Sequence, residues 1–159
     1  MGLRFPDQRG HSVFFVTTTF ADWHRYGDIP EVYPEITDSI NHYCATYSAK
    51  VPAYVLMPSH LHLILSIAGD TLGPYMRDFK KYTAQTWIRN RVIRQSSIWM
   101  ARYDRVALVT SKVTMVKVEY IHYNPVKAGL VGRPEEWLWS SASDYLRDVA
   151  GPVKVCKDW

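Results

Sequence analysis

Two short apolar runs, "AYVLM" at residues 53–57 and "LHLILSI" at residues 61–67, constrain the fold of this chain more than any other feature. Pro58 and Ser59 separate the runs, and both residue types favour a tight turn. The sequence therefore predicts two antiparallel strands, the second beginning at His60. Side chains alternate along a strand, so His60 and His62 are expected on one face and Leu61 on the other.

The segments around this hairpin predict alternating strands and helices. Residues 12–20 are β-branched and aromatic, which favours a strand, and residues 34–49 carry apolar side chains at helical spacing. A long basic amphipathic helix is expected after the capping candidates Asp70 and Thr71. Residues 97–110 predict a strand pair, or one long strand with a turn near residues 103–104. Residues 111–124 predict a helix capped by Ser111 and ending before Pro125.

This order, β-α-β-β-α-β-α, predicts an α+β fold of the ferredoxin-like (RRM-like) plan. An antiparallel sheet would carry helices on one face, followed by a C-terminal helix and tail. The chain has 159 residues, which is enough for one domain with a sizeable core. We therefore predict a single domain over residues 1–159.

Composition excludes several classes of protein. Hydrophobic residues make up 47% of the chain and charged residues 21%, which is typical of a globular protein and not of a disordered one. No apolar run approaches the roughly 18 residues of a membrane span, and the N-terminus lacks the apolar segment of a secretory signal. Cys44 and Cys156 are too few and too far apart for a disulfide framework or a CxxC zinc site. These features predict a cytoplasmic protein without a membrane partner.

Positive charge is concentrated in one region. Residues 77–105 contain eight basic and two acidic residues, although the whole chain has a net charge of only +4. Such a concentration indicates a surface for a polyanion such as nucleic acid, although a solvated helix face can have the same composition. The candidates for DNA contact are Arg77, Lys80, Lys81 and Arg89. Tyr82 or Trp87 could stack on unpaired bases, or both could pack in the core.

The histidine pair has the spacing of a metal site. Alternate residues of a strand have Cα atoms about 7 Å apart, so His60 and His62 could converge on one ion. The alternative without a metal is two histidines that are hydrogen-bonded independently on a sheet face. Imidazole ligands by themselves favour Zn²⁺ or another late transition metal.

The helix "VKVEYIHYNP" offers the groups that such a site lacks. Tyr120 and Asn124 are four residues apart and therefore share a helix face. Asn124 offers a carbonyl oxygen as a ligand, and Tyr120 offers a phenol that can act as a covalent nucleophile. Alternatively, Tyr120 belongs with Val113 and Val116 to an apolar stripe that faces the core, and Asn124 only ends the helix.

Here the sequence resembles a known family. "MPSHLHLIL" resembles the His-hydrophobic-His (HUH) motif of the single-tyrosine transposases, and "VEYIHYNPVKAGLV" followed by "EEWLWSSASDY" is similar to the C-terminal signature of the REP-associated tyrosine transposases. The resemblance runs from about residue 12 to residue 147, with the motifs in the family's order. It implies that His60 and His62 bind a metal, that Tyr120 is the nucleophile, and that Asn124 stands at the third-ligand position, where insertion-sequence relatives commonly carry Gln.

The resemblance also implies a reaction. The expected activity is that of a metal-dependent single-stranded DNA endonuclease and strand-transferase, which acts at DNA hairpins through a 5′-phosphotyrosine intermediate during DNA transposition. The family implies Mg²⁺ or Mn²⁺ as cofactor, and a monomer, with a homodimer as the alternative. Tyr123 is the alternative nucleophile. Two other functions stay open on the residues alone: a non-catalytic ferredoxin-like nucleic-acid-binding module, and a metal-dependent hydrolase that uses activated water.

Overall fold

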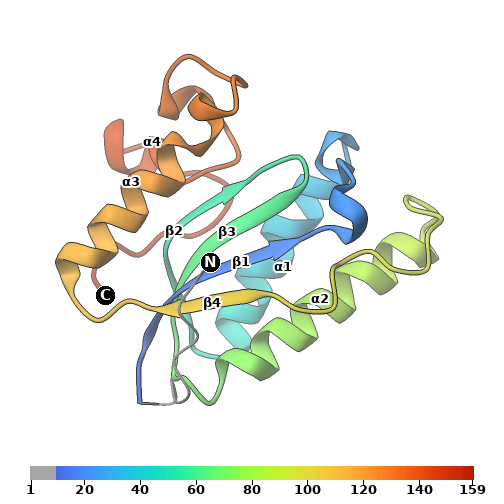
Figure 1. The fold of residues 1–159 in the computed structure, drawn as a ribbon, viewed down its shortest axis with the longest axis horizontal. Coiled ribbons are helices and arrows are strands. Elements are labelled where there is room, and N and C mark those ends of the chain that lie inside the picture. Colours follow the sequence, from blue (N-terminus) through green and yellow to red (C-terminus); the bar gives the residue numbers. More distant parts are fainter. Residues whose placement is uncertain (1–9) are drawn as a thin grey trace.

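A four-stranded sheet with the strand order β2-β3-β1-β4 forms the centre of the molecule (Figure 1). The structure is a computed structural model and describes residues 10–159. The strands are β1 (Val13–Thr19), β2 (Lys50–Leu56), β3 (His60–Ser66) and β4 (Asp104–Ala107). Every neighbouring pair is antiparallel. The α+β, ferredoxin-like fold expected from the sequence is confirmed.

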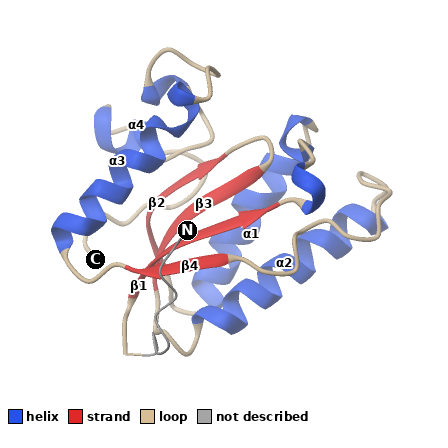
Figure 2. Cartoon of the chain, in the orientation of Figure 1, coloured by secondary structure: helices blue, strands red, loops and turns tan. Residues whose placement is uncertain are grey.

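Helices cover both faces of the sheet (Figures 1 and 2). They are α1 (Val32–Thr46), α2 (Leu72–Arg89), α3 (Ser111–Lys127) and α4 (Ala142–Leu146). Phe14 on β1 belongs to the larger core with residues of α1 and α2, whereas its neighbour Phe15 belongs to a smaller core with Val118 and Ile121 of α3. The alternation of side chains along β1 therefore separates two layers of helices. Within residues 10–159, no helix combines the length and the apolar character that a membrane span requires.

The turn between β2 and β3 begins the second strand at His60, as the sequence predicted. Met57 N donates to His60 O over 2.8 Å, and His60 N donates to Met57 O over 3.3 Å. These two bonds close the hairpin around Pro58 and Ser59. The pairing places Tyr54 opposite Leu63, both on the face that α1 and α2 cover.

The prediction of a long strand or strand pair over residues 97–110 was wrong. Only β4 forms, together with an isolated bridge between Phe20 and Trp99. Trp99 is buried in the core, and the backbone that follows it is held by a side chain. Lys80 donates from Nζ to the carbonyl oxygens of Met100 at 2.7 Å and Ala101 at 3.4 Å. These carbonyls are thus satisfied without a strand partner.

Both predicted ends of α3 were wrong. Thr110, not Ser111, caps the helix, because Thr110 Oγ1 accepts a hydrogen bond from Val113 N over 3.1 Å. The helix also continues through Pro125 to Lys127. A proline inside a helix removes one backbone donor, but only two further helical residues follow it here. Gly129, with φ +74°, then adopts the left-handed conformation that commonly ends a helix.

The other two helices differ less from prediction. α1 begins two residues before the start of the predicted range 34–49 and ends three residues before the end of that range. Thr71 occupies the N-cap position of α2, but its side chain makes no capping bond. The Thr71 hydroxyl instead donates to Asp70 Oδ1 over 3.1 Å.

Candidate active site

The two histidines lie side by side on the face of β3 that α3 partly covers. Their ring centroids are 4.7 Å apart, with the ring planes at 75°. Leu61, between them in sequence, is buried in the core on the opposite face. The alternation predicted for this strand is therefore present.

Hydroxyl groups hold both imidazole rings. Thr17 pairs with His62 across β1 and β3, and its Oγ1 lies 2.9 Å from His62 Nδ1. Ser59 Oγ lies 3.1 Å from His60 Nδ1. When Nδ1 carries the proton and donates to the hydroxyl, Nε2 of each ring keeps its lone pair for a metal ion. Such hydrogen bonds orient the histidine ligands of known metal sites.

Burial keeps both histidines neutral. It lowers the pKa of His60. It also lowers the pKa of His62 to about 3, helped by the repulsion that a proton on His62 would meet from a protonated His60 and from Lys117. Phe15 stacks on the His62 ring at 5.3 Å between centroids and contributes to this apolar surrounding. Neutral imidazole is the form that binds metal, so the pair is ready to act as ligands at neutral pH.

α3 places the Tyr120 ring against this pair. The centroids of Tyr120 and His62 are 5.6 Å apart, and Tyr120 also lies edge-on to Phe15 at 5.9 Å. The Tyr120 side chain stays 39% exposed. The alternative in which Tyr120 shares a buried apolar stripe with Val113 and Val116 is wrong, because all three are exposed, whereas Val118 and Ile121 face the core.

Two lysines that sequence reasoning did not single out flank the tyrosine. Lys117 Nζ lies 5.2 Å from the Tyr120 ring centroid and 4.8 Å from that of Phe15. Lys127 Nζ lies 5.5 Å from the Tyr120 ring. Such positions are favourable for a cation over an aromatic face. Helical spacing could have indicated both, since they precede and follow Tyr120 by three and seven residues.

Asn124 follows Tyr120 by one helical turn and is half-buried. Among residues 10–159, no group of three or more His, Cys, Asp or Glu side chains could hold a metal ion. The histidine pair would therefore need oxygen ligands from an amide such as that of Asn124, from a substrate phosphate or from water. Two imidazoles with such oxygens fit a divalent ion of the Mn²⁺ type.

Comparison with known proteins identifies the family of this chain. The family model described as "Transposase IS200 like" matches residues 25–124, which include His60, His62, Tyr120 and Asn124. The chain belongs to this transposase family. A REP-associated tyrosine transposase of Haemophilus influenzae is 26% identical over 141 residues, 78% of each chain. Another, of Escherichia coli K12, is 31% identical over 104 residues, covering 64% of this chain and 57% of the relative. The predicted resemblance to REP-associated tyrosine transposases is confirmed.

Two solved structures of transposases share the fold. The structure of a REP-associated tyrosine transposase bound to a REP hairpin has a TM-score of 0.76 at 22% identity, over 98% of this chain and 92% of that one. A Deinococcus radiodurans transposase structure has a TM-score of 0.54 at 15% identity, over 74% of this chain and 95% of the other. At these identities the likeness establishes the fold of this transposase.

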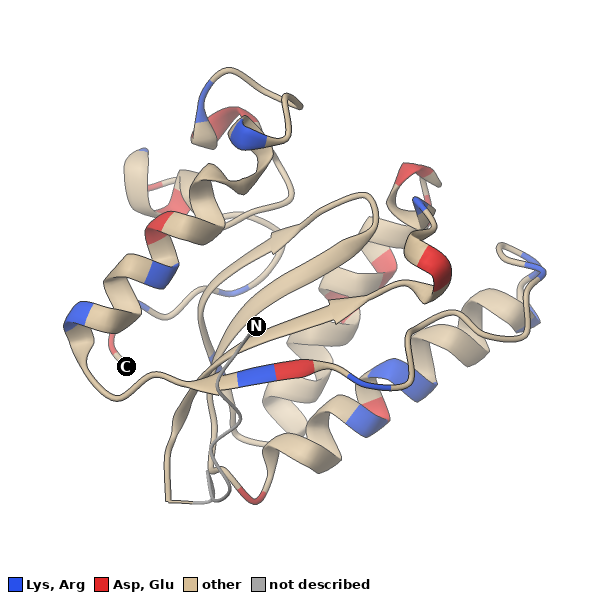
Figure 3. Ribbon diagram, in the orientation of Figure 1, with Lys and Arg blue, Asp and Glu red and all other residues tan. Residues whose placement is uncertain are grey.

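The basic side chains predicted to contact DNA lie away from the histidine pair. They belong to α2, on the other side of the sheet from α3 (Figure 3). Arg77 pairs with Asp78 over 2.8 Å, and Lys80 is engaged with main-chain carbonyls. Lys81 and Arg89 are exposed. Of the two aromatic candidates on this helix, Tyr82 is exposed and Trp87 is buried.

The C-terminal tail of this transposase fastens α3 to the sheet. Trp137 Nε1 donates to Leu56 O over 2.9 Å, and Ser141 N donates to Tyr54 O over 3.0 Å, so residues 137–141 run along the edge of β2. Ser141 Oγ also lies 2.8 Å from Nε2 of His122, a buried residue of α3. The tail thereby fixes the helix that carries Tyr120.

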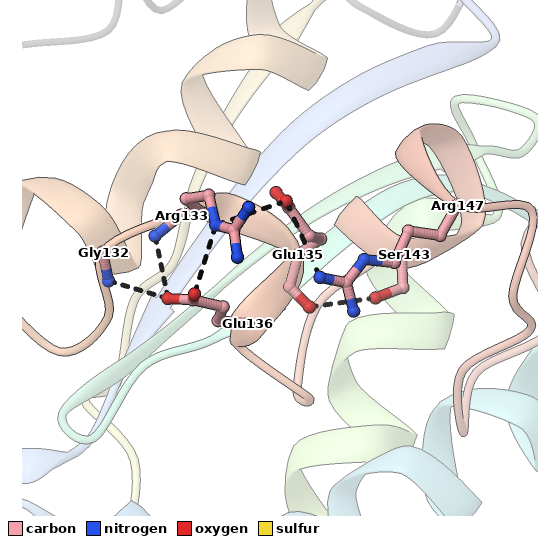
Figure 4. Close-up of polar contacts among 6 residues, drawn as sticks. All are labelled: Gly132, Arg133, Glu135, Glu136, Ser143 and Arg147. Carbon is pink, nitrogen blue, oxygen red and sulfur yellow. Dashed lines mark hydrogen bonds and ion pairs between the residues drawn. The ribbon is translucent and has the colours of Figure 1, made fainter.

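A polar network holds the tail itself (Figure 4). Glu136 accepts hydrogen bonds from the backbone N of Gly132 and Arg133, each over 3.0 Å, and from Arg133 Nε over 3.2 Å. Glu135 pairs with Arg147 over 3.8 Å, and its carbonyl oxygen accepts from Ser143 Oγ over 3.2 Å. The short helix Pro134–Glu136 is thus tied to α4.

Proposed function

We propose that this chain is a metal-dependent transposase that cleaves and rejoins single-stranded DNA beside hairpins through a covalent bond to Tyr120. One observation carries the proposal: the half-exposed Tyr120 ring stands against His62, which lies beside His60, and hydroxyls hold the Nδ1 atoms of both histidines. A hairpin substrate is supported by the similarity to the transposase whose structure was solved with a REP hairpin.

The chemistry exchanges one phosphodiester for another. The Tyr120 phenol loses its proton, its oxygen forms a bond to the scissile phosphorus, and the bond from phosphorus to the 3′ oxygen breaks. The departing 3′ oxygen takes up a proton, while the 5′ phosphate stays on the tyrosine. A 3′-hydroxyl can later attack this phosphotyrosine and release Tyr120, so strands are joined without a nucleotide cofactor. Lys117 and Lys127 place positive charge where the phosphate would bind.

His60 and His62 would hold the metal ion, with Asn124 at the third position. A divalent ion bound there supplies Lewis-acid stabilisation of the charge that develops on the phosphate oxygens. Mg²⁺ and Mn²⁺ are the proposed cofactors, and Mn²⁺ matches nitrogen ligands better. The single domain, the monomeric state and the cytoplasmic location stay predictions.

The decisive experiment is a search for the covalent adduct. The protein is incubated with a 5′-tailed DNA hairpin and Mn²⁺ and then denatured, and we expect a protein–DNA adduct that Tyr120→Phe abolishes. Tyr123→Phe is the matched control, since Tyr123 is 51% exposed on the same helix. An adduct that survives Tyr120→Phe would refute the assignment. Cleavage without any adduct would favour the hydrolase, and binding without cleavage would favour the binding module.

A further inference from the structure

One tryptophan beside the histidine pair has no role in the chemistry described so far. Trp23 is 61% exposed, whereas the other five tryptophans are buried or half-buried. Its backbone and that of Asp22 have φ values of +56° and +54°. Residues other than glycine rarely adopt this left-handed backbone conformation, and here two consecutive residues do so. Such conformations concentrate at functional sites.

The turn that carries Trp23 is fixed to the site. Trp23 N donates to Phe20 O over 3.1 Å, and Phe20 N donates to Ser59 O over 3.0 Å. Ser59 is also the residue whose hydroxyl contacts His60 Nδ1. The ring of Phe20 stacks on the buried Trp99 at 4.5 Å between centroids. The turn that carries the exposed indole is therefore bonded to the site and is not a loose loop.

Four rings form a row across the site: Trp23, His60, His62 and Tyr120. The centroid distances between successive rings are 6.2 Å, 4.7 Å and 5.6 Å. Trp23 and the proposed nucleophile therefore stand at opposite ends of the histidine pair.

This arrangement gives Trp23 a position along the DNA. In an in-line displacement the leaving oxygen departs on the side of the phosphorus opposite the nucleophile. A phosphate bound over the histidines and attacked from the Tyr120 end loses its 3′ oxygen toward the Trp23 end. We propose that Trp23 stacks on the base of the nucleotide immediately 5′ to the broken bond and so positions the leaving group. This inference rests on the proposed function of Tyr120, His60 and His62.

Stacking on an aromatic ring is sequence-tolerant, because every base offers a π face. The exposed indole can thus hold an unpaired nucleotide whichever base it carries. It would act as a positioning residue, and the energy of one stacked base corresponds to a loss of roughly tenfold or more when the ring is removed.

The test combines Trp23→Ala with abasic substrates once the cleavage position of the wild-type protein has been mapped. We expect single-turnover cleavage of the tailed hairpin, at protein concentrations below saturation, to fall roughly tenfold in Trp23→Ala, with partial rescue in Trp23→Phe. Affinity for a hairpin that lacks the unpaired tail should stay unchanged, because no base is then available for stacking. An abasic site 5′ to the break should slow the wild type by a similar factor and Trp23→Ala no further. An abasic site 3′ to the break should slow both proteins equally. Leu138→Ala, which also removes an exposed apolar side chain (73% exposed), is the control and should cleave at the wild-type rate.

Trp23→Ala cleavage at the wild-type rate would overturn the proposal, as would independent, multiplying losses from Trp23→Ala and the 5′ abasic site. A binding measurement separates this failure from failure of the proposed function. In the Tyr120→Phe protein, unpaired DNA should quench part of the tryptophan fluorescence. This quenching should be absent in the double variant that carries both Tyr120→Phe and Trp23→Phe. Absence of this quenching in the Tyr120→Phe protein would refute stacking, whereas absence of the Tyr120 adduct would refute the nucleophile.

Discussion

Replacing Thr17 with valine tests whether one hydroxyl prepares His62 as a metal ligand. Thr17 Oγ1 lies 2.9 Å from His62 Nδ1, and valine keeps nearly the same shape while removing this partner. Loss of a hydrogen bond that orients a histidine ligand typically costs 10- to 100-fold in metal affinity, or about 1.4 to 2.8 kcal/mol. We expect Thr17→Val to weaken Mn²⁺ binding by this factor. The Mn²⁺ concentration that gives half-maximal cleavage should rise by the same factor.

Unfolding without DNA measures the same change independently of catalysis. At a Mn²⁺ concentration of about 100 times the wild-type Kd, binding stabilises the native state by about 2.7 kcal/mol. A Kd about 30-fold weaker would reduce that gain to about 0.9 kcal/mol at the same concentration. Urea unfolding with Mn²⁺ and with a chelator resolves this difference.

Thr18 provides the matched control, because it follows Thr17 and points to the opposite face of the sheet. Its hydroxyl is buried without a hydrogen-bond partner among the described residues. Thr18→Val should therefore keep the Mn²⁺ response and leave the free energy of unfolding unchanged or about 1 kcal/mol higher. A Thr17→Val protein that responds to Mn²⁺ like wild type, or an equal loss in Thr18→Val, would refute the reasoning.

Further predictions concern stability and DNA contact. Burial lowers the pKa of His122 to about 4, so the unfolded chain binds more protons than the native state between about pH 4 and 6.5. His122 alone should leave stability undiminished above pH 6.5 and lower it by about 2 kcal/mol by pH 5. Urea unfolding of His122→Gln should show a loss smaller by about that amount, and a pH profile that the substitution leaves unchanged would contradict this. Lys80→Met should destabilise the fold by about 1 to 2 kcal/mol because it removes the bonds to two carbonyls, and an unchanged urea midpoint would argue against that role. Lys81 is exposed, and Lys81→Met should leave stability unchanged. It should reduce the slope of log K for DNA binding against log salt concentration by about one, and a slope equal to that of the wild type would contradict this prediction.

Local patterns in the sequence were sufficient to predict the hairpin and the pairing of the two histidines on one face. The start of β3 at His60 depends on the turn residues beside it, and the shared face of His60 and His62 depends only on alternation along one strand. Helix periodicity likewise related Tyr120 to Asn124. It did not give the face of α3 that is buried, because exposed apolar residues such as Val116 imitate a core stripe.

The sequence by itself thus determined which side chains share a face and can be proposed for the chemistry, since strand and helix periods act between residues close in the chain. Only the tertiary structure decided what surrounds them. Thr17 meets His62 across 45 residues through the register of β1 and β3, and Trp23 reaches His60 because its turn is bonded to the β2–β3 turn. Lys80, a predicted DNA contact, donates to two carbonyls about twenty residues away. Such contacts depend on the packing of distant segments, which no local pattern encodes.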